Sequence, residues 1–188
     1  MAGDAEATKR RLLAAATKEF AAYGIAGARV DRIAAEAGCN KAQIYHYFVS
    51  KDGLFDAVFN QIVIRTVQET PIDPAELPEY AGRLFDAYER YPEVARLATW
   101  YRLERSTADA PLELILASNK NKVEAVAKAQ KDGVLPKKYE PIVLLGLVLH
   151  LASLWTGMTL EYELLVRRTS TAERRKVVTD AVAALLKD

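Results

Sequence analysis

Two short helical segments separated by a tight turn constrain this chain more than any other feature of its sequence. From Val30 to Ala37, apolar residues recur at the helical positions i, i+3, i+4 and i+7, and Gly38 ends the pattern. Asn40 then occupies the position of an N-cap, ahead of a second segment that continues to about Phe48. Because two helices joined by a turn of three or four residues form a helix-turn-helix, we predict that geometry here.

Helical periodicity recurs along the rest of the chain and strand signals are scarce, so we predict an all-α fold. In the first helix we expect Leu13, Ala16 and Phe20 to be buried, with Gly24 as the C-terminal cap. Ser50 is expected to cap the fourth helix. The expected helices lie at about residues 5–23, 30–37, 41–48, from 51 onward, 76–91, 93–106, 112–131, 141–165 and 171–187.

Charge and composition restrict the class of protein. Residues 1–51 carry eight basic and five acidic side chains, whereas the whole chain has a net charge of +1. A basic head of this kind suits a polyanionic partner. Cys39 is the one cysteine, which excludes an internal disulfide and a paired-cysteine metal site. The sequence has no P-loop, dinucleotide-binding, zinc-protease or serine-hydrolase motif, so we expect no catalytic residue, metal or cofactor, and no enzyme.

The surface of the second short helix indicates a nucleic-acid partner. Ile44 and Phe48 lie four residues apart and should both face inward, which leaves the remaining side chains outward. Tyrosine hydroxyls donate to phosphate oxygens, glutamine can bond base edges, and histidine can do either. The alternative is that Tyr45 and Tyr47 are half-buried core residues. The side chains expected to face outward are Lys41, Gln43, Tyr45, His46 and Tyr47.

Two lysines stand at the first position of a helix, directly after an N-cap. They are Lys41 and Lys51. A positive charge at this end opposes the helix dipole, and a bound phosphate would reverse the sign of that effect. The pattern therefore favours an anion at both helix starts, with accidental surface lysines as the alternative.

Residues 9–60 resemble the DNA-binding domain of the tetracycline-repressor (TetR) family of bacterial regulators. The resemblance rests on VDRIAAEAG at residues 30–38, KAQIYHYF at 41–48 and SKDGLF at 50–55. It implies homodimers that bind near-palindromic double-stranded DNA operators, with the helix of residues 41–48 in the major groove. By this resemblance, the DNA-contact positions are Asn40, Lys41, Ala42, Tyr45, His46 and Tyr47, with Lys51 on phosphate and Gln43 contributing to sequence preference.

Two positions depart from the family pattern. Members often carry a hydroxyl residue at the start of the second helix, where this chain has Ala28 and Arg29. Arg29 can still reach phosphate, but that helix start lacks a hydroxyl cap. The proline frequent before Ser50 is Val49 here, which we expect to leave the turn less rigid.

The resemblance also implies that residues 1–50 form the helix-turn-helix domain and residues 51–188 a larger helical bundle that binds a ligand and dimerises. Aromatic and polar side chains in this bundle can line a cavity, with ordinary core packing as the alternative for each. The candidate pocket residues are Phe85, Tyr88, Trp100, Tyr101, Glu104, Asn119, His150 and Trp155. The last two helices favour a four-helix subunit interface. Its candidate residues are Leu147, Leu151, Leu154, Val178, Ala181, Val182 and Leu185.

These features together predict a cytoplasmic DNA-binding repressor that is released by a small, mostly apolar effector. A DNA-binding regulator without a small-molecule ligand is one alternative. A single-span membrane-anchored regulator is another, because residues 142–160 contain no charged side chain and match the length of a span. His150 and the hydroxyls of that segment argue against the membrane, and the charged N-terminal residues do not form a secretory signal.

Overall fold

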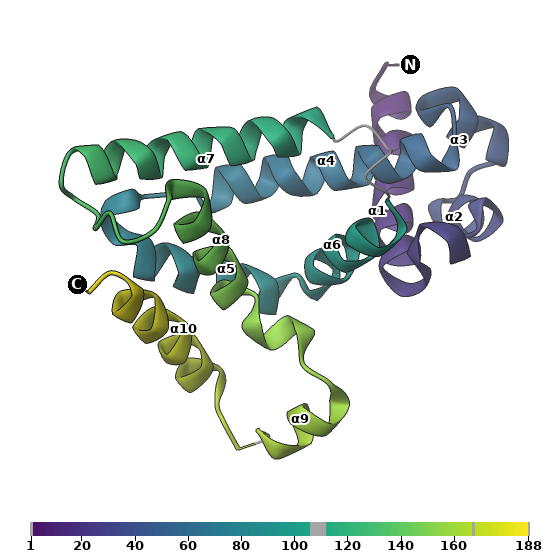
Figure 1. Ribbon diagram of the computed structural model, residues 1–188. Coiled ribbons are helices and arrows are strands. Elements are labelled where there is room, and N and C mark those ends of the chain that lie inside the picture. The colour runs from purple at the N-terminus through teal and green to yellow at the C-terminus, as the bar shows by residue number, and fades with distance from the viewer. Residues whose placement is uncertain (1, 106–111, 167, 188) are drawn as a thin grey trace. The chain divides into compact units, whose positions relative to one another are not determined.

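The computed structural model describes residues 2–105, 112–166 and 168–187, and every regular element in these ranges is helical (Figure 1). The predicted all-α fold is confirmed. In chain order the elements are α1 (Ala2–Gly27), α2 (Val30–Ala37), α3 (Lys41–Phe48), α4 (Lys51–Glu69), the 3-10 helix η1 (Pro74–Glu76), α5 (Leu77–Arg90), α6 (Pro92–Glu104), α7 (Glu113–Lys131), α8 (Pro141–Ala152), the 3-10 helix η2 (Leu154–Gly157), α9 (Leu160–Leu165) and α10 (Thr171–Leu185).

The chain divides into two compact units. The first contains Met1–Ile64 and Glu93–Leu114, and the second contains Arg65–Pro92 and Ile115–Asp188. Helix α4 therefore begins in the first unit and ends in the second, while α6 lies almost wholly in the first. The functional boundary predicted between residues 50 and 51 stays a prediction.

The core of the first unit forms where α1 packs on α2, and α2 on α3. Phe20 of α1 meets Phe55 of α4 edge to face, with ring centroids 5.2 Å apart. Leu12, rather than the predicted Leu13, is the buried leucine of α1. Leu12, Ala16 and Phe20 are four residues apart and share one face, whereas Leu13 is turned toward the edge of that face and is half-buried.

The core of the second unit is built from α5, α8 and α10, which pack on one another. Arg175 of α10 joins two carboxylates of α5, Glu79 at 2.5 Å and Asp86 at 2.9 Å. Gly82 lies under this contact, because a Cβ atom there would come within 2.8 Å of the Arg175 guanidinium. The glycine thus allows α5 and α10 to approach closely.

The prediction of one continuous helix over residues 141–165 is wrong. Helix α8 ends at Ala152, the short η2 follows, and α9 begins at Leu160. Hydroxyl groups stabilise the break, since the Ser153 side chain donates to a backbone carbonyl of α8 and Thr159 caps α9. No helix in the described ranges is long and apolar enough to span a membrane.

Replacing Leu144 of α8 with alanine is expected to lower the free energy of unfolding by about 2–5 kcal/mol. Leu144 is only 1% exposed in the second core, and truncation leaves a cavity. Urea unfolding measures the difference. The control is Val134→Ala, because Val134 is 54% exposed and its truncation should change stability by at most about 0.5 kcal/mol. Equal losses in the two variants would contradict the core position of α8.

Candidate nucleic-acid interface

The turn between α2 and α3 is set by local backbone chemistry. Gly38 ends α2 in the left-handed conformation, with φ 64°, which an L side chain rarely adopts. Asn40 then caps α3 by accepting from the Gln43 backbone N–H at 3.0 Å. The Gln43 side chain closes a capping box by accepting from the Asn40 N–H at 3.2 Å. The predicted helix bounds and N-cap are confirmed, and the start of α3 is firmly fixed.

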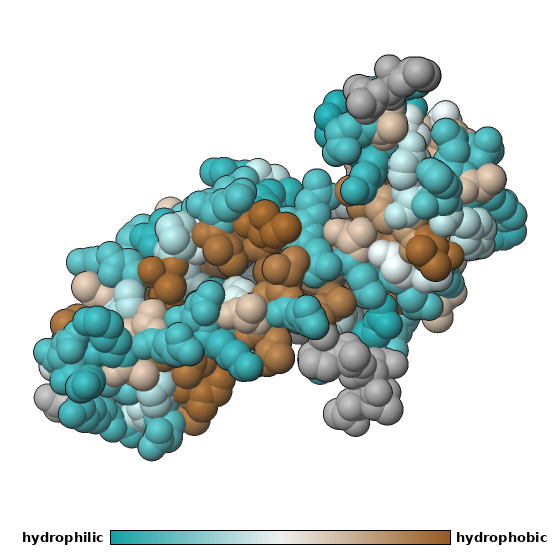
Figure 2. Space-filling view, turned by 90° about the horizontal axis from the view of Figure 1, so that it is seen from above, coloured by the Kyte–Doolittle hydropathy of each residue, from teal (hydrophilic) through white to brown (hydrophobic). Residues whose placement is uncertain are grey.

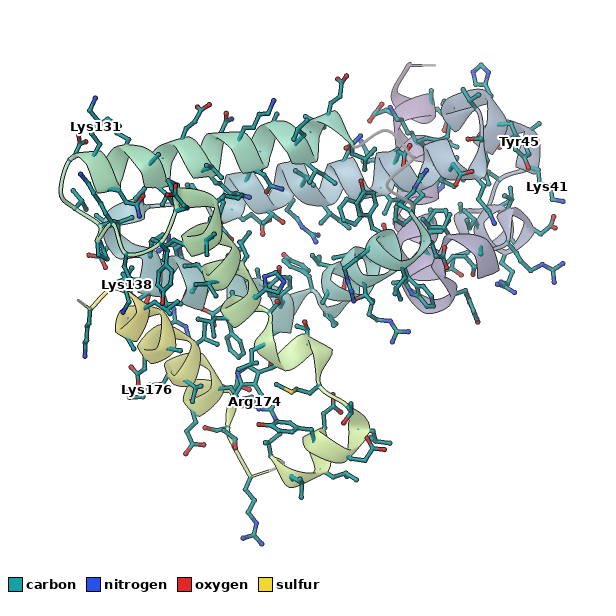
Figure 3. All side chains as sticks on the ribbon, viewed as in Figure 1. Lys41, Tyr45, Lys131, Lys138, Arg174 and Lys176 are labelled. Carbon is teal, nitrogen blue, oxygen red and sulfur yellow. The ribbon has the colours of Figure 1, made fainter. Side chains whose placement is uncertain are left out.

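Two apolar side chains hold α3 against the first core and leave its other face free. Ile44 is fully buried and Phe48 is 7% exposed. Tyr45 is 49% exposed, and Figure 3 shows it and Lys41 on the outer side of the helix. His46 is exposed too, whereas Tyr47 is half-buried with its ring 5.2 Å from that of His46. The exposed face therefore offers a phenol, an imidazole and an ammonium to a partner.

The ammonium of Lys41 forms an ion pair with the Asp31 carboxylate of α2. Both side chains are about half exposed, with relative exposures of 53% and 55%. Surface pairs of this kind contribute little net stability. Lys41 can therefore exchange Asp31 for a phosphate at small cost.

A carboxylate from α1 occupies the start of α2, where the sequence lacks a hydroxyl cap. Glu19 accepts from the Arg29 backbone N–H and from the Arg32 guanidinium, both at 2.8 Å. Burial of Glu19 opposes its ionisation, but the hydrogen bonds from Arg32 and Arg29 prevail and hold the pKa of this carboxyl below its usual value. The Arg29 side chain itself is exposed.

Lys51, at the start of α4, ties down the connection between α1 and α2. Its ammonium donates to the carbonyl oxygens of Ala26 at 3.2 Å and Ala28 at 3.3 Å. An ammonium has three donors, so one remains available for phosphate while these two bonds persist.

The two residues between α3 and α4 form a strained turn. Val49 has φ 66° and ψ −44°, and the Ser50 N–H donates to the Phe48 carbonyl at 2.7 Å. These values describe a γ-turn with positive φ, which is rare for a β-branched residue. A proline, whose φ is fixed near −65°, could not adopt this conformation. From the sequence we expected a less rigid turn, because Val49 replaces a proline. The structure instead shows a turn whose backbone conformation excludes proline.

Helix α6 holds the end of α1 through a carboxylate. Helical geometry in α1 is interrupted at Gly24, which has φ 71° and ψ −176°. Glu104 accepts from the two backbone N–H groups that follow, Ile25 at 2.6 Å and Ala26 at 2.8 Å. A Cβ atom on Gly24 would lie 2.4 Å from the Glu104 carboxylate, so glycine is needed for this approach.

Helix α6 also binds a backbone carbonyl of α1 that precedes the interruption at Gly24. The Ala21 carbonyl accepts from Arg96 at 2.8 Å and from the Trp100 indole at 3.3 Å. Tyr101 stacks on Phe59 of α4 with ring centroids 4.9 Å apart. Helix α6 is thus a structural part of the first unit, attached to both α1 and α4.

Two family models match the chain, one toward each end. The model of bacterial regulatory proteins of the tetR family matches residues 12–58, and that of the tetracyclin repressor-like C-terminal domain matches residues 76–183. The chain belongs to the TetR family of bacterial transcriptional regulators. This is a family of regulators and not of enzymes.

Individual transcriptional regulators resemble the chain over half of its length or more. The transcriptional repressor SCO4008 of Streptomyces coelicolor is 40% identical over 153 residues, 81% of this chain and 80% of the relative. The repressor NicS of Pseudomonas putida is 35% identical over 106 residues, 52% of this chain and 50% of the relative. Among solved structures, the regulator SCO4942 of Streptomyces coelicolor is 37% identical, with a TM-score of 0.84 and coverage of 95% and 97% of the two chains.

The TetR-family fold does not bring the eight predicted pocket residues together in one unit. Trp100, Tyr101 and Glu104 lie in the first unit and hold α6 in place. The other five lie in the second unit. There Phe85 is buried in the core, Tyr88 and Trp155 pack against it, and Asn119 and His150 are exposed.

The predicted subunit interface needs a correction at two positions. Val178 and Val182 are 1% and 0% exposed within the single chain, because they face α5 and α8 in the second core. They have no surface left for a second copy. The five remaining candidates are half-buried: Leu147, Leu151, Leu154, Ala181 and Leu185.

Sequence reasoning missed the carboxylates that organise this TetR-family head. Glu19 falls on the inward face of α1 with Leu12 and Ala15, and that spacing was a usable signal of burial. Asp31 gave none, and Glu104 was predicted as a pocket residue rather than as a backbone acceptor, because the partners of both are set by the tertiary fold. Glu104 acts on residues 78 and 79 positions away in the chain.

Replacing Glu104 with alanine is expected to cost about 1–3 kcal/mol of stability, because two backbone N–H groups lose their acceptor. Glu104→Gln keeps a carbonyl acceptor and should recover most of that loss. Thermal unfolding of the two variants measures the difference. If alanine and glutamine are equally destabilising, the charge rather than the hydrogen bonds holds α6, and the proposed reading of this contact is wrong.

Glu19→Gln is expected to destabilise the protein at neutral pH, with a difference that shrinks in acid. The folded pKa of Glu19 lies below the usual value of 4.5, so the ionised carboxylate stabilises the fold above that pH. The contribution disappears as the pH falls through the lower, folded pKa. Unfolding midpoints of both proteins between about pH 3 and about pH 7 should therefore converge at the acid end. A gap that is constant across this range would contradict an ionised role.

Proposed function

We propose that the chain is a homodimeric repressor that places one α3 helix in each of two successive major grooves of a near-palindromic operator. The single observation that carries this proposal is the face of α3 that exposes Lys41, Tyr45 and His46 while Ile44 and Phe48 anchor the helix. Half-sites would then lie about 34–36 Å apart, one turn of the double helix. Regulators of this family bind DNA operators as dimers.

The side chains around α3 divide into two roles on DNA. Lys41, Lys51 and the exposed Arg29 suit phosphate, because they are cations at or near helix starts. His46 and Tyr45 suit base edges or the adjacent backbone. The other proposed DNA-contact positions are Asn40, Ala42 and Tyr47, and Gln43 is proposed to contribute to sequence preference. Asn40 and Gln43 also fix the start of α3 through the capping box.

Dimerisation is proposed through the outer faces of α8 and α10. Apolar residues remain exposed there in the single chain, with Val143 at 49% and Val177 at 46%. On the one face of the protein that Figure 2 shows, apolar residues reach the surface in several patches. Because Val178 and Val182 face inward, their neighbours Ala181 and Leu185 are the interface residues proposed for α10.

Release by a small-molecule effector in the second unit completes the proposal. Some members of the family bind such effectors. FadR of Bacillus subtilis, solved in complex with stearoyl-CoA, shares the fold with a TM-score of 0.71 at 13% identity and coverage of 95% and 97%. SCO4008 and NicS are repressors, which favours repression over activation for this chain. A coupling of about 1–3 kcal/mol between effector and operator is typical of such switches.

A DNA-binding regulator without a small-molecule ligand is the second candidate. It is favoured by Trp100, Tyr101 and Glu104, three expected pocket residues that instead hold α6 to α1 and α4. The two candidates share the DNA-binding function and differ only in what controls it.

The DNA-binding function is tested by selecting a duplex from a random pool and titrating it in a gel shift at several salt concentrations. Lys41→Ala should reduce the slope of log Kd against log salt by about 2, because each of the two subunits loses one phosphate contact. The control is Lys138→Ala, in the second unit, where the lysine is exposed. Failure of the dimer to select any duplex at low salt would refute the function itself.

Asp31→Asn should tighten binding to the same duplex by up to about fivefold for each subunit, the equivalent of one surface ion pair in each. The substitution removes the carboxylate that competes with phosphate for Lys41. The double variant Asp31→Asn, Lys41→Ala should show no such gain. A gain that persists without Lys41 would mean that Asp31 acts only through general repulsion of DNA.

A further inference from the structure

The inward face of α7 contains two polar residues in an otherwise apolar row. Val126 and Ala129 lie on this face and are buried in the second core. Ser118 and Lys122 precede them at the same helical spacing, and both are withdrawn from full solvent exposure. Because they are four residues apart, their side chains are neighbours on one face of the helix.

Neither of these side chains has a partner within the described residues of the protein. The Ser118 hydroxyl is buried and makes no hydrogen bond. The Lys122 ammonium makes no hydrogen bond or ion pair in those ranges, and burial lowers its pKa. Lys128, farther along the same helix, is exposed and paired with Asp132. Lys122 is half-buried, so its ammonium is partly withdrawn from water without a counter-charge, and an anion beside it would offset that loss of hydration.

Other donors without acceptors occur in the same core. The Tyr80 hydroxyl and the Trp155 indole N–H are buried and make no hydrogen bond in the described structure. Burial raises the pKa of Tyr80 to about 12 and also raises that of Tyr88, so both phenols keep their protons. Two carboxylates that could serve as acceptors, Glu79 and Asp86, are already bound by Arg175. The second unit thus has an excess of buried donors.

We propose that the second unit binds an organic anion, with Lys122 and Ser118 of α7 holding its carboxylate or phosphate head and the apolar core receiving its body. This proposal rests on the effector-binding role proposed above and names the chemical class of the effector. An anion supplies the missing counter-charge to Lys122 and the missing acceptor to Ser118 together. A neutral apolar molecule would supply neither.

The competing explanation is that Lys122 only extends its stem along the core and keeps its ammonium in water. Lys122→Met separates the two, because methionine keeps an unbranched apolar stem and removes the charge. In the ligand-free protein the anion site predicts a rise of about 2–4 °C in the unfolding midpoint. The matched control is Lys120→Met, because Lys120 is exposed on the same helix and should leave the midpoint unchanged. A lower midpoint for Lys122→Met would overturn the proposal.

Binding is tested with three probes of equal chain length, octanoate, octyl phosphate and octanol, at equal concentration. At least one of the two anions should raise the unfolding midpoint of the wild-type protein by about 2–4 °C more than octanol does. The larger shift identifies the preferred head group. Lys122→Met should abolish the difference, Ser118→Ala should reduce it, and Lys120→Met should retain it. Equal shifts from all three probes, or an anion effect that survives Lys122→Met, would overturn the anion site.

This readout does not involve DNA, so the two proposals can fail separately. Stabilisation by an anion through Lys122, in a protein that selects no duplex, would refute the repressor function and leave the anion site in place. Selective DNA binding by a protein that treats octanol and the anions alike would refute the anion site alone.

Discussion

The burial of Ile44 and Phe48 is the constraint on which the first unit depends. An eight-residue helix is not stable by itself in water, because nucleation costs more than so few hydrogen bonds return. Helix α3 therefore exists because these two side chains join the core and because Asn40 and Gln43 cap its start. The same anchoring decides which face is left outside. Exposure of Tyr45 is thus a consequence of packing and not a separate feature.

In the protein without DNA, two carboxylates already form ion pairs with cations of residues 1–51. Glu19 binds Arg32 at the start of α2, and Asp31 binds Lys41 at the start of α3. The buried contact at Glu19 is part of the fold, whereas the exposed contact at Asp31 can be exchanged. The net positive charge of residues 1–51 is therefore larger than the positive charge near α3 that is not already paired with a carboxylate. In the proposed complex with DNA, a phosphate replaces Asp31 as the partner of Lys41.

The sequence predicted α2 and α3 to the residue, because Gly38 and Asn40 encode a local conformation that needs no tertiary information. It failed where the outcome depends on distant partners. From its own helix, Glu104 was predicted to be a pocket residue. Only the tertiary fold shows that it accepts hydrogen bonds from the backbone N–H groups that follow Gly24. Hydropathy likewise merged α8 with α9, because an apolar run does not reveal where a helix stops. The DNA-contact and pocket assignments, and the interface assignments other than Val178 and Val182, stay predictions.

The γ-turn at Val49 has a mechanical consequence for the recognition surface. Only Val49 and Ser50 separate α3 from α4, and both are held by backbone hydrogen bonds around a strained conformation. Because this connection is short and held by hydrogen bonds, we expect a rotation of the start of α4 about its own axis to rotate α3 as well. The direction in which the Tyr45 side chain points therefore depends on the orientation of the start of α4.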